Sequence, residues 1–223
     1  ICKLLYSAQD KTEAIKMLQE TRIAQPLLFS LEYSLAHLWK TWGIKPQMLL
    51  GHSLGEYVAA CLSGVFSLET ALHLVAVRGE LMQSMPAGKM LAVYLDRESC
   101  ISWLDAACSL AAVNAPKLCV VSGPVESIKA LERRLNQAKV RNVYLNVSHA
   151  FHSSMMDPIV DKFAEEVARV EKQAPTIKFV SNITGNWISA AEAMDPYYWG
   201  RHIRETVHFS EGLQKLLDVA DNI

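Results

Sequence analysis

Apolar residues recur at spacings of three and four along the first forty residues, which is the pattern of amphipathic helices. The apolar positions are Ala14, Met17, Leu18, Leu27, Leu28, Leu31, Leu35, Leu38 and Trp39. This spacing predicts two helices. Gly43 and Pro46 end the second one, and residues 47–50 then form a short apolar run that is typical of a buried strand.

The same alternation of helix and strand continues downstream. We expect a helix over residues 54–62, which ends before Gly64, and a helix over residues 68–82, which Ser67 can cap. Much later, a helical stripe from Met156 to Val170 precedes a strand over residues 177–180. These segments predict an α/β fold.

Between residues 89 and 147 the pattern changes to βαββαβ, which is the order of a ferredoxin-like unit. The expected strands are 90–95, 110–113, 118–122 and 140–147, and the expected helices are 99–107 and 125–136. Because the α/β pattern resumes afterwards, we interpret residues 89–147 as a small subdomain inserted into a large one, formed by residues 1–88 and 148–223. A cleft is expected between the two.

Composition and charge narrow the class of protein. Hydrophobic residues make up 51% of the 223 residues, which is typical of a folded domain. Lys and Arg number 22 against 23 Asp and Glu, so nucleic acid and anionic membranes are not expected as partners. No apolar run approaches the ~20 residues of a membrane span and no signal peptide is recognisable, so a cytoplasmic location is predicted.

Five scattered cysteines without a C-x-x-C pair predict neither a disulfide framework nor a metal site.

The most informative motif is Gly51-His52-Ser53-Leu54-Gly55, a G-x-S-x-G between a predicted strand and a predicted helix. So tight a turn presents the serine hydroxyl outward as a candidate nucleophile, and the Leu54 amide at the helix start is the natural oxyanion donor. The motif alone fits equally well an ordinary turn in which Ser53 only caps the helix.

A nucleophilic serine needs a base, for which histidine is the usual side chain. Of the seven histidines, His37 and His73 lie in helical patterns, and His52 lies in the elbow, where its side chain should point away from Ser53. His149 and His152 lie in a short polar loop directly after the last strand of the inserted unit, where the chain returns to the large subdomain. Both are candidates.

Arg78 shares an apolar helix face with Leu74, Val75 and Met82. It can be an edge residue whose guanidinium reaches solvent, which is the commoner outcome. Alternatively, it is buried and binds a substrate carboxylate through its planar fork.

Six motifs in order resemble the malonyl-CoA:acyl-carrier-protein transacylase family, and most closely the acyltransferase domains of modular type I polyketide synthases. The motifs are residues 51–56, Arg78-Gly79 with Met82-Gln83, and residues 112–116, 148–153, 181–185 and 198–202. The resemblance implies an α/β-hydrolase-like large subdomain with the inserted ferredoxin-like unit.

The resemblance also implies roles for individual residues. Ser53 would accept the acyl group, His152 would be the general base, and Arg78 would pair with the free carboxylate of the acyl group. The substrate-binding residues would be Arg78, His52, Met82, Asn114, His149 and Phe151. Asn182 would support the site, and the histidine would be oriented by a backbone carbonyl at the position of His202, whose side chain would be incidental.

The segment His149-Ala150-Phe151-His152 matches the pattern that the family associates with malonyl units, whereas methylmalonyl-selective domains usually carry Tyr-Ala-Ser-His. A phenyl ring at Phe151 would hinder an added methyl, although one methyl is worth only ~1 to 3 kcal/mol of discrimination. Malonyl is expected, with methylmalonyl as the alternative.

The implied reaction moves a malonyl unit from malonyl-CoA, through an acyl-serine, to the phosphopantetheine thiol of an acyl carrier protein. No bound cofactor is expected, and the partners would be the carrier protein with a ketosynthase and other domains of the same polypeptide. The family's Gly-Gln-Gly loop, a second oxyanion donor, is absent from the sequence. We therefore expect a missing N-terminal part and a rate lower by ~10² to 10³.

Three alternatives remain. A discrete fatty-acid-type transacylase would share the motifs. An α/β-hydrolase or thioesterase would need an acidic triad member, and Asp96 and Asp105 lie in the inserted unit, which argues against it. A docking module is suggested by a local basic run that could also receive an acidic carrier protein or CoA phosphates. The run comprises Lys129, Arg133, Arg134, Lys139 and Arg141, opposed by Glu132.

Overall fold

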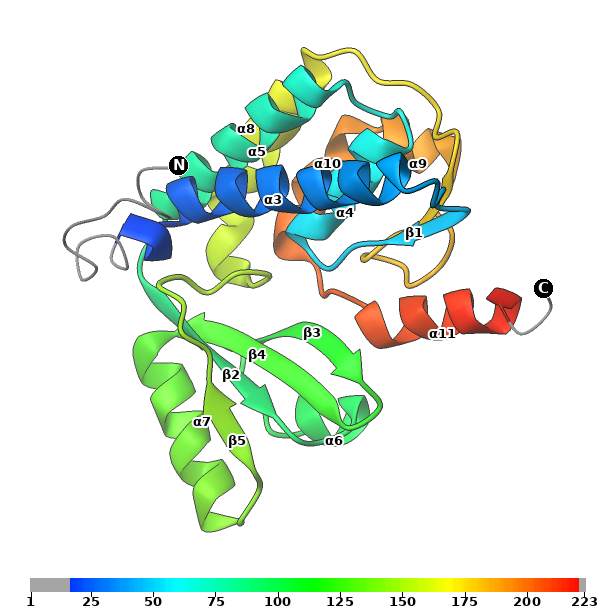
Figure 1. Ribbon diagram of the computed structural model, residues 1–223. Helices are drawn as coiled ribbons and strands as arrows, with labels where there is room; N and C mark the ends of the chain where they lie inside the picture. Colours follow the sequence, from blue (N-terminus) through cyan, green and yellow to red (C-terminus); the bar gives the residue numbers. More distant parts are fainter. Residues whose placement is uncertain (1–16, 221–223) are drawn as a thin grey trace, which may run out of the picture.

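Two lobes lie one above the other in the computed structural model, which describes residues 17–220 (Figure 1). The large lobe carries most of the helices, and the small lobe is a sheet with two helices on one face. The mixed α/β fold class predicted from the sequence is confirmed. The subdomain boundaries at residues 88/89 and 147/148 stay a prediction.

The large lobe contains a short parallel pair of strands, in which Leu49 lies opposite Phe179. Its elements are α3 (Thr21–Thr41), β1 (Met48–Leu50), α4 (Leu54–Leu62), α5 (Leu68–Gln83), η1 (Ser154–Met156), α8 (Asp157–Ala168), β6 (Lys178–Val180), α9 (Ala190–Met194), α10 (Pro196–Arg204) and α11 (Phe209–Ala220). Aromatic side chains fill the core between these helices, with Tyr57, Phe163 and Trp199 fully buried. The strand and the two helices predicted around the G-x-S-x-G motif are confirmed.

The apolar stripe predicted for the first helices is largely exposed in the structure. Ala14 lies outside the described residues. Helix α3 buries Thr21, Gln25 and Phe29 instead, at spacings of four. The stripe residues Leu28, Leu31, Leu35, Leu38 and Trp39 are 43–53% exposed. Helix α3 therefore packs on α4 and α5 through a face that includes polar side chains.

The small lobe is a four-stranded antiparallel sheet in the order β3-β4-β2-β5, which is the ferredoxin-like order. Its elements are β2 (Gly88–Val93), α6 (Arg97–Ile101), β3 (Ser109–Ala115), β4 (Leu118–Pro124), α7 (Val125–Gln137) and β5 (Asn142–Tyr144). Helix α7 contributes Ile128, Leu131 and Leu135 to the core against the sheet.

Two small-lobe elements are shorter than predicted. Asp96 accepts a hydrogen bond from the Ser99 amide at 2.9 Å, so α6 begins at Arg97 rather than 99, and it ends at Ile101. The following turn is closed by Asp105, which accepts from the amides of Ala107 and Cys108. Strand β5 is an outer strand that pairs with β2 over three residues only.

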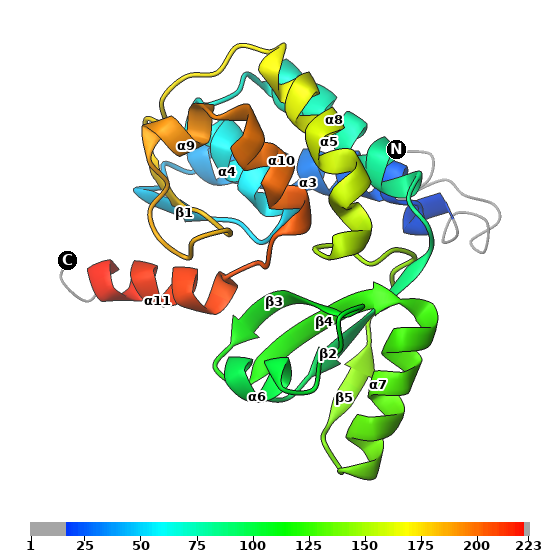
Figure 2. The ribbon, with the colours of Figure 1, turned by 180° about the vertical axis from the view of Figure 1, so that it is seen from behind.

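The lobes contact each other at several places. The chain enters and leaves the small lobe side by side, where the Gly88 amide donates to the Ser148 carbonyl at 3.0 Å. Residues 205–208 run along β3, and α11 contacts both β3 and β1 (Figure 2). None of the helices in the described part of the chain has the length and apolarity to cross a membrane.

Candidate active site

The turn between β1 and α4 holds Ser53 in a strained conformation, with φ 49° and ψ −109°. A Cβ on Gly51 would lie 2.0 Å from the backbone carbon of Gly55, so only glycine fits at position 51. A Cβ on Gly55 would meet only the Glu32 carboxylate, at 3.5 Å, an ordinary contact. The tight turn predicted at the G-x-S-x-G motif is therefore present, and of its two glycines only Gly51 is sterically required.

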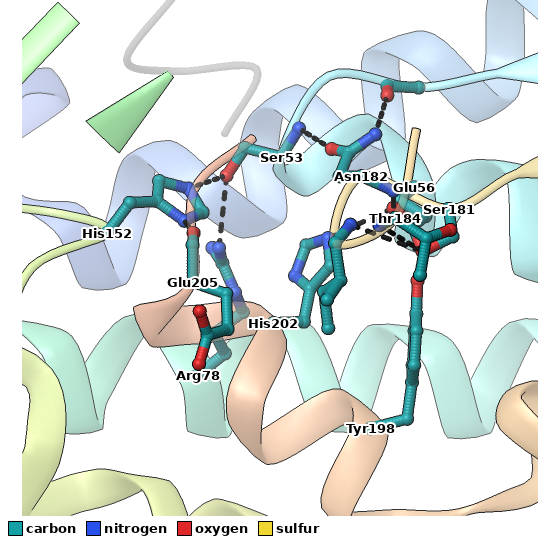
Figure 3. Close-up of polar contacts among 12 residues, drawn as sticks. Ser53, Glu56, Arg78, His152, Ser181, Asn182, Thr184, Tyr198, His202 and Glu205 are labelled. Carbon is teal, nitrogen blue, oxygen red and sulfur yellow. Dashed lines mark hydrogen bonds and ion pairs between the residues drawn. The ribbon is translucent and has the colours of Figure 1, made fainter. Parts of the chain in front are cut away.

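Asn182 fixes this elbow from the loop after β6 (Figure 3). Its side-chain oxygen accepts from the Ser53 amide at 2.6 Å, and its side-chain nitrogen donates to the Gly51 carbonyl at 2.7 Å. Asn182, for which the resemblance implied a supporting role, thus contacts both sides of the serine turn. The Ser53 amide is therefore engaged, whereas the Leu54 amide is the first in α4 and has no intrahelical acceptor.

Glu56 lies beneath the elbow and is fully buried. Its carboxylate accepts hydrogen bonds from the backbone amide of Asn182 at 2.7 Å and from the Tyr198 hydroxyl. The carboxylate also lies 3.2 Å from the His202 ring nitrogen Nε2 (Figure 3). Sequence reasoning did not single out Glu56. The signal was present, because a carboxylate in an otherwise apolar helix needs buried partners.

His152 is the histidine that reaches the serine. Its Nε2 lies 2.7 Å from the Ser53 hydroxyl, and its Nδ1 lies 2.9 Å from the Glu205 carbonyl oxygen. A carbonyl only accepts, so Nδ1 carries the proton in the neutral ring and Nε2 is free to accept one. His149 is engaged elsewhere, with the Ser148 hydroxyl at 2.7 Å and the Met85 carbonyl at 3.1 Å.

The orienting carbonyl belongs to Glu205 and not, as predicted, to His202. His202 lies within α10, where carbonyls point along the helix axis. Glu205 is the C-cap of α10 and has an extended backbone, which turns its carbonyl away from the axis. The His202 side chain is not incidental either, because it is buried against Glu56.

Burial holds the pKa of His152 well below its ordinary value, and the positive charge of Arg78 and the neighbouring His202 lower it further. The hydrogen bond to Glu205 acts in the opposite direction. The imidazole is therefore neutral near pH 7, which is the form that a general base requires.

Arg78 is buried, with 2% of its surface exposed, so the solvent-reaching alternative is wrong. One guanidinium nitrogen donates to the Gln25 side-chain oxygen at 2.6 Å, and the other donates to the Ser53 hydroxyl at 3.2 Å. The guanidinium also lies 5.2 Å from the centre of the Tyr57 ring. Among residues 17–220, no carboxylate lies within salt-bridge distance of it.

Gln25 is a site residue that sequence reasoning missed. Besides accepting from Arg78, it donates to the Met82 sulfur at 3.1 Å. A polar residue at the i+4 spacing between Thr21 and Phe29 was the available signal, but the stronger leucine stripe on the other face concealed it. Met82 itself is buried beside Arg78, as predicted for a residue of this helix face.

The remaining predicted residues lie where the two lobes meet. His52 is exposed and points to the small lobe, where its Nε2 lies 2.7 Å from the Asn114 side-chain oxygen. The Phe151 carbonyl accepts from the Ser122 hydroxyl at 2.7 Å, and the Phe151 side chain packs against the apolar cores of both lobes.

The strained Ser53, the neutral buried His152 and the buried Arg78 lie together in one site on an α/β fold. A family model described as the acyl transferase domain matches residues 3–223. The chain belongs to the acyl transferase domain family and is an acyltransferase. The family resemblance inferred from the motifs is thereby confirmed.

Relatives and solved structures agree with this assignment. The phenolphthiocerol synthesis polyketide synthase type I Pks15/1 of Mycobacterium marinum is 40% identical over 202 residues, which are 90% of this chain and 10% of that protein. Polyketide synthase GfsB of Streptomyces halstedii is 38% identical over 209 residues, which are 92% of this chain and 4% of that protein.

Among solved structures, the acyl transferase domain of ZmaA has a TM-score of 0.88 and 41% identity, covering 97% of this chain and 51% of that one. A malonyl CoA-acyl carrier protein transacylase from Burkholderia pseudomallei has a TM-score of 0.85 and 32% identity. The match covers 93% of this chain and 73% of that one. The chain thus spans a small part of its polyketide synthase relatives and about half of the ZmaA domain.

Proposed function

We propose that this acyltransferase takes a malonyl unit from malonyl-CoA and passes it, through an ester on Ser53, to the phosphopantetheine thiol of an acyl carrier protein. The observation that carries the proposal is the position of the Ser53 hydroxyl. It lies 2.7 Å from the neutral imidazole of His152 and 3.2 Å from the buried guanidinium of Arg78.

The first half-reaction forms the acyl-serine. The Ser53 oxygen attacks the thioester carbonyl as its proton moves to Nε2 of His152. The Leu54 amide donates to the oxyanion, and the Glu205 carbonyl stabilises the protonated ring through Nδ1. The thiolate of CoA leaves with the proton from Nε2, so the histidine returns to its neutral form.

Arg78 supports a substrate with a free carboxylate. A buried guanidinium without an ionic partner is costly, and a carboxylate that replaces its contact to the Ser53 hydroxyl would satisfy it with a bidentate pair. Gln25 holds the other guanidinium nitrogen of Arg78 in place, and the Tyr57 ring limits the movement of the guanidinium. Acetyl groups would leave the charge unpaired.

The second half-reaction repeats the first with a different thiol. The phosphopantetheine thiol of the carrier protein gives its proton to His152 and attacks the Ser53 ester, and the serine oxygen recovers the proton as it leaves. Polyketide synthases among the relatives, of which this chain covers a small part, support a carrier protein and a ketosynthase on the same polypeptide.

The side chain of Phe151 supports malonyl over methylmalonyl, because it packs between the two lobe cores and leaves less room than a serine would. A discrete transacylase remains the alternative context, since a Burkholderia transacylase has a similar structure. A triad hydrolase is disfavoured because Nδ1 of His152 meets a backbone carbonyl rather than a carboxylate.

The test uses the full-length protein and malonyl-CoA labelled in the acyl group. We expect wild-type protein to become covalently labelled and to transfer the label to a carrier protein, and S53A to remain unlabelled. Labelling of S53A, or release of free malonate without transfer, would contradict the proposal. Competition between malonyl-CoA, methylmalonyl-CoA and acetyl-CoA in the same assay tests the acyl group.

A further inference from the structure

The segment between α10 and α11 connects the catalytic histidine to the small lobe. Glu205 supplies the carbonyl that His152 meets, and the next two residues run beside strand β3. One residue further on, the His208 amide donates to the Asn182 carbonyl at 2.8 Å, and Asn182 is the residue that holds the Ser53 turn. This short segment therefore touches the base, the serine turn and the small lobe.

The outer edge of strand β3, which no other strand of the sheet covers, pairs with this segment. In the sheet order β3-β4-β2-β5, β3 is an outer strand, and outer strands present unpaired backbone groups. The Val207 amide donates to the Ala111 carbonyl, and the Val113 amide donates to the Val207 carbonyl, both at 2.9 Å. Val207 is 1% exposed and packs in the apolar cluster of the small lobe.

Thr206 lies between Val207, which pairs with β3, and Glu205, whose carbonyl meets His152. Its hydroxyl donates to the Leu110 carbonyl of β3 at 2.6 Å. The Glu205 carbonyl and the Thr206 nitrogen share one planar peptide unit, so holding Thr206 fixes the direction of the oxygen that His152 needs. On the other side of Glu205, its amide donates to the Arg201 carbonyl at 2.8 Å.

We propose that Thr206 is a positioning residue for the Ser53–His152 pair, acting through its hydrogen bond to strand β3 of the small lobe. The small lobe then has a role in aligning the base. The inference rests on the serine–histidine pair of the proposed function, but it does not depend on which acyl group is carried.

The test measures the reactivity of Ser53 with a fluorophosphonate, which reports serine activation without any CoA thioester. In the full-length protein, T206V removes the hydroxyl and T206S keeps it. T176V is the matched control, because the Thr176 hydroxyl donates to the Ser63 carbonyl at 2.8 Å and Thr176 touches neither Ser53 nor His152. Thermal unfolding of all variants is measured in parallel.

We expect T206V to lower the maximal inactivation rate about fivefold, which is the effect of losing one hydrogen bond, with the half-saturating probe concentration unchanged. T206S should restore the rate, and T176V should lower the melting temperature without changing the inactivation rate. Equal rates for T206V and wild type, or equal losses in T206V and T176V, would overturn the inference.

Failure of the proposed function has a different signature. If malonyl-CoA does not label wild-type protein while the fluorophosphonate does, the acyl donor is wrong and the role of Thr206 is still decided by its variants. If the fluorophosphonate does not modify wild-type Ser53, both the activated serine and the positioning role are refuted.

Discussion

Arg78 and His152 both contact the Ser53 hydroxyl, and the charge of the arginine affects the proton affinity of the histidine. Burial contributes most to the low pKa of His152, with Arg78 next. The two side chains come from α5 and from the loop after the small lobe, so their interaction exists only in the folded chain. At this scale the site combines a neutral histidine with a buried arginine, and both contact the same hydroxyl.

The pH dependence of serine reactivity tests this coupling. Because the pKa of His152 is lowered, the fluorophosphonate reaction should remain fast as the pH falls through 6.5 and decline only well below it. R78A removes a charge that lowers the pKa, so its acidic decline should move to higher pH.

The control for this prediction is R78K, which keeps the positive charge. Its acidic decline should lie closer to that of the wild type than to that of R78A. A decline at the same pH in R78A and wild type would show that the arginine does not act on the histidine.

At the scale of elements, β1, the elbow and α4 form one unit that is held from β6 by Asn182. The two strands lie side by side, so the loop after β6 reaches the turn after β1. The strained Ser53 conformation persists because Gly51 lets the backbone of Gly55 approach and because Asn182 bonds to both sides of the serine.

Substitution of Gly51 should therefore lower the free energy of unfolding more than substitution of Gly55. G51A places a methyl group 2.0 Å from the Gly55 backbone and should lower the free energy of unfolding by about 3 kcal/mol or more. G55A meets only the end of the Glu32 side chain and should change it by less than about 1 kcal/mol. Urea denaturation of the two variants measures the difference, and equal losses would contradict it.

At the scale of the whole molecule, the site lies where the lobes meet, and the segment 205–208 and the His52–Asn114 contact both cross between them. The small lobe therefore borders the candidate site. Burying a neutral histidine at this junction also makes the stability of the whole fold depend on pH.

The direction of this dependence follows from proton binding. The unfolded chain binds a proton at His152 near pH 6.5, whereas the folded protein binds it only at lower pH. The contribution to stability is complete above pH 6.5 and is lost as the pH falls from 6.5 toward the folded pKa. Unfolding free energies at pH 7.5 and 5.5 should show this loss in wild type and a smaller one in H152Q; equal losses would contradict it.

The sequence by itself determined the elements and the chemistry that depends on neighbouring residues. Hydrophobic spacing predicts β1, α4, α5 and the ferredoxin-like order, because each depends on local periodicity. The tight turn around Ser53 was also predictable, because the G-x-S-x-G motif that forms it spans only five neighbouring residues. Ordered motifs then identified the family.

Only the tertiary structure decided the contacts between distant segments. It placed His152, which the family motif had already indicated, against Ser53, assigned the orienting carbonyl to Glu205, and brought Gln25 to Arg78. These contacts depend on where helices end and which strand edges remain free, and periodicity does not contain that information. A helix that ended one turn later than α10 would hold the Glu205 carbonyl along its axis, away from His152.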